Sequence, residues 1–305
     1  MNNGSLLKGL DGSNPLAFLA ALGTLRTLTL ALPEENVKMS WEQSDGAWRP
    51  RVFSSLADHG DEAQISNALY TALKNPSPVL QADKRLPFAA ARFRSLLRDA
   101  ANNCNLSQLE WLACLGTDAT PKSDDEVFDD TAFRMVRSGD SAGQGMLHYA
   151  CQVIKDTQPA DLHHCLFERW IYRNNGFSFR WDPREDTQYA LQANNPSKEG
   201  VQSVIGANRL ALEALPLFPV YVSRKTPVTL GFRPIDRASL MELRWPIWDR
   251  PITLSVTCSL LGLPALRDSP LKKGTLRAAG IATVMSCTQY KPNKYYTNFR
   301  PAVVL

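Results

Sequence analysis

Three carboxylates stand close together around one proline, in the segment Trp181-Asp182-Pro183-Arg184-Glu185-Asp186. Nucleases that use two metal ions need several acids converging on Mg²⁺, so Asp182, Glu185 and Asp186 are the candidates for that chemistry. Acids this close in sequence more often cap a turn or the following helix. No downstream Glu-x-Lys partner accompanies them. The pattern therefore favours a structural turn, with a metal-dependent nuclease as the alternative.

Histidines and cysteines lie near one another in two neighbouring segments. His148 and Cys151 are spaced i, i+3 on a predicted helix, and His164 and Cys165 follow after a short gap. Zinc is held by such nitrogen and sulfur ligands, usually four of them. The spacing matches no standard zinc knuckle, and two adjacent helices with buried cysteines explain the same residues. We therefore expect no metal and no cofactor.

Cations alternate with tyrosines near the end of the chain, between residues 289 and 300. Cations bind phosphates, and aromatic rings stack on bases, so this composition is typical of a nucleic-acid-binding segment. A terminal strand whose rings pack on a sheet while its cations face water has the same composition. Both interpretations stay open at this point.

The charge distribution points to the same half of the chain. Residues 1–160 carry 15 Lys+Arg and 19 Asp+Glu, whereas residues 161–305 carry 19 and 11, a net charge of +8. Such asymmetry suggests one surface that faces a polyanion, although a solvated surface with chance asymmetry would give the same count. The candidate nucleic-acid-binding residues are Arg184, Arg209, Arg224, Lys225, Lys272, Lys273, Lys291, Lys294, Tyr295, Tyr296 and Arg300.

Two common catalytic motifs are missing from the sequence. Residues 138–145 are rich in glycine, but no Gly-Lys-Ser/Thr follows them and no buried strand precedes them, which argues against a phosphate-binding loop. There is also no Gly-x-Ser-x-Gly nucleophile elbow. We therefore expect a protein that is not an enzyme.

The composition is that of an ordinary globular protein, with 44% hydrophobic and 21% charged residues. The first apolar run, residues 16–32, contains Arg26 and follows a single lysine, so it is neither a signal peptide nor a membrane span. None of the six cysteines forms a Cys-x-x-Cys pair, and all but Cys104 lie among apolar or small residues. This usage favours buried thiols in a reducing compartment and predicts a cytoplasmic protein without membrane contact.

The clearest element is a helix that follows Asn14-Pro15. Asparagine caps helices, proline suits the first helical position, and leucines recur at helical spacing until Pro33. Gly23 inside this helix is costly, so we expect it to lie against another backbone. Asp45-Gly46, between two alternating segments, predicts a β-hairpin.

The remaining pattern predicts an α+β fold with a helix-rich N-terminal half and a strand-rich C-terminal half. We expect helices at residues 61–73, 87–101, 107–115 with Ser107 as cap, 145–154, 161–171 and 207–215. We expect strands at residues 177–181, 220–223, 228–232, 242–245 and 279–290. Residues 252–261 could form a strand or a helix, and their β-branched residues favour the strand. The acidic and glycine-rich segment 117–145 suggests a boundary between a mainly helical region, 1–140, and an α+β region with a basic tail, 141–305. One continuous domain is the alternative.

Two segments resemble proteins encoded with type I CRISPR–Cas systems, especially those of the G (formerly U) subtype. The first is Gly9-Leu10-Asp11-Gly12-Ser13-Asn14-Pro15-Leu16-Ala17-Phe18-Leu19-Ala20-Ala21-Leu22-Gly23-Thr24-Leu25-Arg26. It is similar to the N-terminal helix of large-subunit-like proteins and of the accessory family that extends the helicase-nuclease. The second runs from Trp181-Asp182-Pro183, through Asn195-Pro196-Ser197 and Gly206-Ala207-Asn208-Arg209, to Leu215-Pro216-Leu217-Phe218-Pro219. Together they cover about a quarter of the chain.

The resemblance implies a subunit of an RNA-guided surveillance complex in antiviral defence. In such complexes guide pairing reads the sequence, while protein subunits hold the backbone or read a short flanking motif. The partners implied are other type I effector subunits, the helicase-nuclease, and guide RNA or target DNA. The alternatives are the metal-dependent nuclease above and an adaptor that binds the helicase-nuclease without touching nucleic acid.

Overall fold

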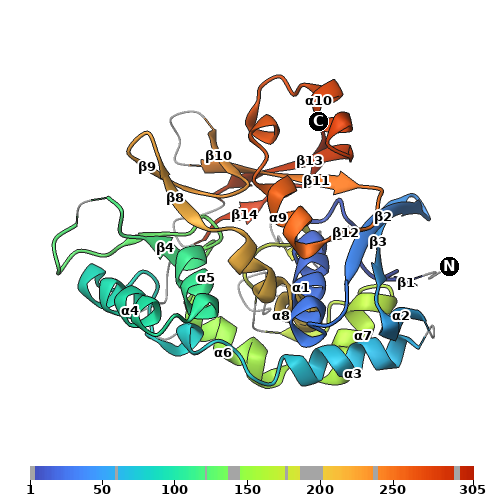
Figure 1. The fold of residues 1–305 in the computed structure, drawn as a ribbon, viewed down its shortest axis with the longest axis horizontal. Coiled ribbons are helices and arrows are strands. Elements are labelled where there is room, and N and C mark those ends of the chain that lie inside the picture. The colour runs from blue at the N-terminus through green and yellow to red at the C-terminus, as the bar shows by residue number, and fades with distance from the viewer. Residues whose placement is uncertain are drawn as a thin grey trace, which may run out of the picture.

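Helix α1 (Pro15–Ala31) runs through the centre of the fold (Figure 1). The computed structural model describes residues 4–58, 61–120, 122–136, 145–175, 178–185, 202–235, 240–291 and 296–305. Every residue from Pro15 to Leu28 is buried, as expected for a helix that is apolar on all sides. Asn14 caps the helix, because its side chain accepts hydrogen bonds from the backbone N–H groups of Leu16 (2.9 Å) and Ala17 (3.3 Å). The predicted start of the helix is confirmed.

Helix α8 (Ile205–Ala214) is buried along its whole length and packs directly on α1. A Cβ atom added to Gly23 would lie 1.7 Å from the carbonyl oxygen of Leu210, so only glycine allows the two backbones this close. The predicted close contact of Gly23 is confirmed. Its partner is a helix from the other half of the chain.

An antiparallel sheet flanks α1 on one side. Its strand order is β1 (Ser5–Leu6), β3 (Ala47–Phe53), β2 (Lys38–Ser44) and β12 (Ile252–Thr253). The β2–β3 turn has positive φ at both Asp45 (51°) and Gly46 (72°), the geometry that Asp-Gly hairpins adopt. The predicted hairpin is confirmed, and β12, which pairs with β2, comes from the C-terminal half.

The other helices that precede α8 form a layer beneath α1 and α8 and extend to one end of the molecule (Figure 1). They are α2 (Ser55–Asp58), α3 (Glu62–Ala72), α4 (Ala90–Asn102), α5 (Leu106–Leu115), α6 (Met146–Asp156) and α7 (Pro159–Phe167). Asn105 caps α5, so Ser107 is not the cap. Helix α7 ends at Phe167, four residues before the predicted end, because Glu168 turns to extended backbone.

The C-terminal half forms a second antiparallel sheet, ordered β10 (Phe232–Ile235), β11 (Leu240–Trp248), β13 (Ile281–Tyr290) and β14 (Asn298–Phe299), with β15 (Val303–Val304) also paired to β13. A hairpin of β8 (Val220–Ser223) and β9 (Thr226–Thr229) precedes it. In the sequence, helices α9 (Leu254–Leu261) and α10 (Lys273–Ala278) come between β11 and β13, which pair directly in the sheet. Two short pairs complete the strands, β4 (Gly116–Thr117) with β5 (Asp129–Asp130) and β6 (Asn174–Asn175) with β7 (Gln202–Ser203).

Three strand predictions are wrong. Residues 228–232 are not one strand, because β9 ends at Thr229, β10 begins at Phe232, and the chain turns between them at Gly231 with a positive φ of 82°. Only Ile252 and Thr253 pair with a neighbouring strand, and the next eight residues form α9, so tertiary context overrides their β-branched composition. Residues 178–181 form no strand; the chain turns there, and Arg180 has a positive φ of 64°. Phe177 lies outside the described residues.

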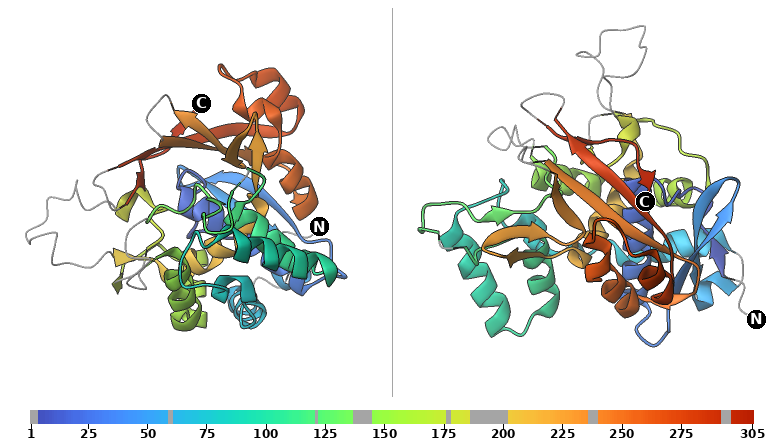
Figure 2. Two further views of the ribbon diagram at one scale, coloured as in Figure 1. Left: turned by 90° about the vertical axis from the view of Figure 1, so that its left-hand side faces the viewer. Right: turned by 90° about the horizontal axis from the view of Figure 1, so that it is seen from above.

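The two halves share one hydrophobic core. Figure 2 shows the C-terminal sheet on one side of α1 and α8 and the helical layer on the other. Two tryptophans of β11 join the halves, since Trp245 Nε1 donates to Gly12 O (2.9 Å) and Trp248 Nε1 donates to Met39 O (2.8 Å). The fold is α+β as predicted, with helices mostly in the first half and strands mostly in the second. Among the described residues, no helix is long and apolar enough to cross a bilayer.

Candidate functional site

The two segments that carry the family resemblance meet at Asp182. Asn14 Nδ2, at the start of α1, donates to Asp182 Oδ1 (2.9 Å) across 168 residues of sequence. Tyr172 Oη donates to Oδ2 (2.8 Å), and the backbone N–H of Arg184 donates to Oδ1 (2.9 Å). Asp182 is fully buried, so its carboxylate ties three segments together in the interior.

A second buried carboxylate, Glu185, follows in the 3₁₀ turn η3 (Pro183–Glu185). The Ser178 hydroxyl donates to its Oε2, and the Asn208 side chain and the Arg180 charge also favour its ionised form. Burial raises the pKa of Asp182, although its hydrogen bonds favour the charged form. Burial and the nearby charge of Asp182 raise the pKa of Glu185 as well. Both acids hydrogen-bond within the turn, in agreement with the favoured interpretation of a structural turn. Asp186 lies outside the described residues.

The described residues contain no group of three or more His, Cys, Asp or Glu that could hold a metal ion. The histidine–cysteine set that suggested zinc does not converge. Cys165 is buried, with its thiol donating to Leu162 O (3.3 Å). His164 is engaged on both ring nitrogens, by Glu168 Oε2 (3.1 Å) and by the Ile171 N–H (3.1 Å). His148, Cys151, His164 and Cys165 are thus parts of two neighbouring helices, α6 and α7.

A pocket of about 590 Å³ opens beside Asp182, which we call the Asp182 pocket. It lies between the turn before α1, the segment after α7, the η3 turn and the chain end at Pro301 and Ala302. Four cations line it, namely Lys8, Arg49, Arg169 and Arg184. Lys8 pairs with Glu62 (3.4 Å) and Arg49 Nη1 donates to Leu10 O (3.0 Å). Arg169 and Arg184 are exposed and form no salt bridge with another described residue.

Two aromatic side chains form part of the same pocket wall. Trp170 Nε1 donates to Cys165 O (2.8 Å), and Tyr172 is anchored on Asp182. Their ring centroids lie 6.4 Å apart with the planes at 75°. The pocket also contains Asp11 and Glu168, whose carboxylates bond to Ser13 and His164. Fixed aromatic rings beside exposed arginines provide both a stacking surface and phosphate ligands.

Arg209 is a correction to the sequence-based site, because it is buried rather than free to contact phosphate. Only 1% of it is exposed. Its Nη1 pairs with Glu213 Oε1 (2.7 Å) and its Nη2 donates to Leu73 O (3.1 Å). An arginine on a fully buried helix needs such partners, so Arg209 supports the packing of α8.

The other predicted cations lie in separate places. Arg224 and Lys225 are exposed in the β8–β9 turn, both with positive φ. Lys272 and Lys273 are exposed at the start of α10. Arg267 was not predicted; it lies before α10 with its guanidinium 5.1 Å from the ring centroid of Tyr221 in β8. The hairpin and the α10 region are therefore joined by one cation–π contact.

The tail residues that the structure describes fit both interpretations of its sequence, since its tyrosines pack within the chain and some of its cations face solvent. Arg300 lies over the ring of Tyr290 (4.7 Å) and Arg180 lies over Tyr296 (4.4 Å), so these tyrosines already stack on cations of the same chain. Lys291 is exposed at the end of β13. Lys294 and Tyr295 lie outside the described residues.

Sequence reasoning missed most of the Asp182 pocket, including Lys8, Arg49, Arg169, Trp170 and Tyr172. One signal was available. The run Arg169-Trp170-Ile171-Tyr172-Arg173 alternates cations and aromatic residues in the same way as the tail. Nothing in the sequence, however, indicated that it lies beside Asn14 and Asp182.

Comparison with known proteins yields no match to this chain among family models, curated proteins or solved structures.

Proposed function

We propose that this chain is a non-catalytic subunit of a type I CRISPR RNA-guided complex, in which it binds protein partners and holds nucleic-acid backbone at the Asp182 pocket. The family part of the proposal rests on the sequence resemblance. The observation that carries the binding part is the pocket at the junction of the two resembling segments, with exposed Arg169 and Arg184 beside Trp170 and Tyr172. Exposed guanidinium groups that form no salt bridge with another described residue keep their charge available for phosphates.

The geometry favours binding over cleavage. Both carboxylate oxygens of Asp182 accept hydrogen bonds within the chain, which occupies the atoms that a metal ion would need. The exposed cations on the β8–β9 turn and at the start of α10 add positive charge to the C-terminal half of the chain, which also contains Arg169 and Arg184. They would strengthen attraction to a long polyanion without reading its sequence.

The binding part is tested by fluorescence anisotropy with single-stranded DNA, duplex DNA and RNA over a range of salt concentrations. We expect salt-sensitive binding, and the double variant Arg169→Ala/Arg184→Ala should bind more weakly. The slope of log K against log salt is negative, and each lost phosphate contact reduces its magnitude by about 0.7 on a single strand, so the loss of two contacts reduces it by about 1.4.

A matched control removes two exposed arginines elsewhere. Arg92 and Arg98 lie on α4, at the opposite end of the molecule from α7 (Figure 1). The variant Arg92→Ala/Arg98→Ala loses the same net charge but should keep the wild-type slope. Equal slopes for all three proteins, or binding that ignores salt, would contradict the assignment of the pocket.

Two further measurements separate the alternatives. Co-expression with type I effector subunits and the helicase-nuclease, followed by affinity purification, should recover a complex; recovery without any nucleic-acid affinity would favour the adaptor. Incubation of the purified chain with nucleic acid and Mg²⁺ should leave the substrate intact. Cleavage that Asp182→Asn abolishes would refute the non-catalytic proposal.

A further inference from the structure

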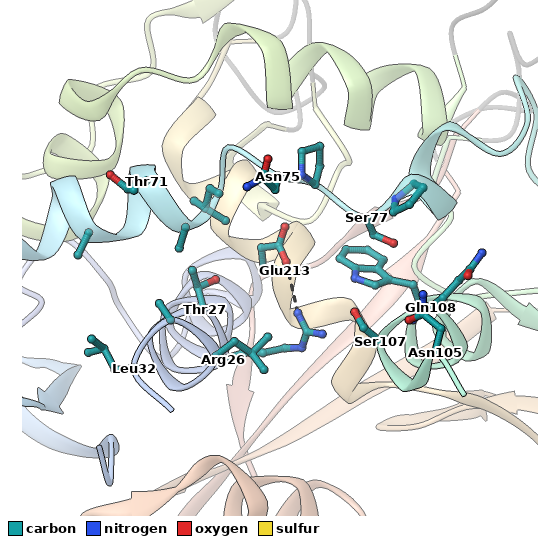
Figure 3. A pocket seen from close by; sticks show the side chains of 18 of the residues that line it. Arg26, Thr27, Leu32, Thr71, Asn75, Ser77, Asn105, Ser107, Gln108 and Glu213 are labelled. Atoms are coloured by element: carbon teal, nitrogen blue, oxygen red, sulfur yellow. Dashed lines mark hydrogen bonds and ion pairs between the residues drawn. The ribbon is translucent and has the colours of Figure 1, made fainter. Parts of the chain in front are cut away.

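A pocket of about 930 Å³ lies between α1, α3, the segment that follows α3, and α5 (Figure 3). We call it the Arg26 pocket. Clefts that bind small molecules usually measure about 300–1,000 Å³ and are mainly apolar with a few placed polar groups. This pocket has that character, since the rings and alkyl groups of Trp111, Leu30 and Leu32 line it beside one charged pair.

Arg26 is the only cation and Glu213 the only acid among the described residues that line the pocket. Arg26 Nη1 contacts Glu213 Oε2 (3.4 Å), and Nη2 contacts Glu110 Oε2 (3.1 Å). Glu213 is held from its other side by Arg209 (2.7 Å). Glu110 differs, because its side chain is 56% exposed and does not line the pocket. Arg26 therefore has one fixed partner and one that can return to water.

The wall of the Arg26 pocket contains a further polar side chain, that of Thr27. Thr27 is 6% exposed, and its hydroxyl forms no hydrogen bond with any described residue. A buried hydroxyl without a partner is unfavourable, and a polar atom of a ligand would remove that penalty. The other labelled polar side chains around the pocket, including Thr71, Asn75 and Gln108, are uncharged (Figure 3).

We propose that the Arg26 pocket binds a small molecule that carries one planar carboxylate on an apolar body. The guanidinium fork matches a carboxylate in shape and charge. A single cation beside a fixed glutamate does not suit a polyphosphate. The ligand carboxylate, bound from the pocket side, competes with Glu110 for the Arg26 guanidinium, because a salt bridge to an exposed side chain is weak and easily exchanged. The apolar body lies against Trp111 and the leucines.

The test uses 4-fluorobenzoate and its neutral analogue 4-fluorobenzamide as probes, with binding to the full chain followed by fluorine NMR. We expect the carboxylate to bind about tenfold more tightly than the amide, the effect of a hydrogen bond to a charged group. Glu110→Gln removes the competing carboxylate and should tighten binding of the carboxylate probe about two- to fivefold. Thr27→Val keeps the shape of the side chain but removes its hydroxyl, and should weaken binding of the carboxylate probe.

Asp45→Asn is the matched control for Glu110→Gln, since it removes one negative charge at the exposed β2–β3 turn, outside the pocket lining. It should leave both affinities unchanged. The proposal is overturned if the two probes bind alike, if neither binds, or if Glu110→Gln and Asp45→Asn have the same effect. Because Glu110 is mostly exposed, its substitution leaves the fold intact and the test does not depend on a core variant.

Discussion

Gly23 gives the sharpest test of the packing at the centre of the molecule. In Gly23→Ala the new Cβ would lie 1.7 Å from Leu210 O and 2.6 Å from the carbonyl carbon of the same residue. Carbon and oxygen atoms normally approach to about 3.3 Å, so the helices must move apart by about 1.5 Å. The clash is with backbone, which cannot rotate away as a side chain can.

The expected cost follows from two opposing effects. Alanine is a better helix former than glycine by about 1 kcal/mol, which favours the variant. Overpacking a core costs about 1–3 kcal/mol, and parting two backbones that are buried on all sides lies at or above the upper end. We therefore expect a net loss of at least about 2 kcal/mol in the free energy of unfolding.

The assay is urea unfolding at equilibrium, with Gly274→Ala as control. Gly274 lies near the start of α10, and an added Cβ there meets nothing within 4 Å. This variant should be as stable as wild type or more stable, by up to about 1 kcal/mol. If Gly23→Ala gains stability as Gly274→Ala does, α1 and α8 do not pack at this distance and the reasoning fails.

Three other predictions concern buried charge and thiols. Burial and the charge of Asp182 raise the pKa of Glu185 to about 8, above the unfolded value of about 4.5. The protonated carboxyl therefore stabilises the folded state in acid, and this contribution to the free energy of unfolding is lost as pH rises from about 4.5 to about 8. Urea unfolding from about pH 5 to about pH 9 should show a shallower fall for Glu185→Gln than for wild type; parallel curves would contradict the burial of this carboxyl. Glu213→Gln leaves Arg26 and Arg209 without their shared partner and should cost about 3–5 kcal/mol in unfolding free energy, whereas Glu110→Gln should cost about 1 kcal/mol or less. Titration with a thiol reagent should modify the exposed Cys104 and Cys258 in the folded protein and Cys114, Cys165 and Cys287 only after unfolding, and early reaction of any of the last three would place it at the surface.

The exposure of Cys258 also shows where local composition misleads. Its neighbours are apolar, which suggested a buried thiol, but α9 lies at the surface and presents this side chain to solvent. Apolar neighbours in sequence bury a side chain only on the face that packs. The periodicity of a segment this short did not identify that face.

By itself the sequence determined the features that short-range physics controls. The Asn14 cap, the Asp45-Gly46 turn and the leucine spacing of α1 each depend on a few adjacent residues, and all three are found in the structure. Gly23 belongs with them, because a glycine inside an apolar helix has little reason to be there except a close backbone. The α+β class followed from the sum of such local signals.

Only the tertiary structure decided which distant surfaces meet. It placed Asn14 against Asp182, and so formed the Asp182 pocket from segments 168 residues apart. It also buried Arg209, which sequence reasoning had assigned to phosphate, because α8 packs on all sides and an ion pair with Glu213 compensates the charge. Charge and type are local properties of a residue, whereas exposure and partners depend on how the helices and sheets pack.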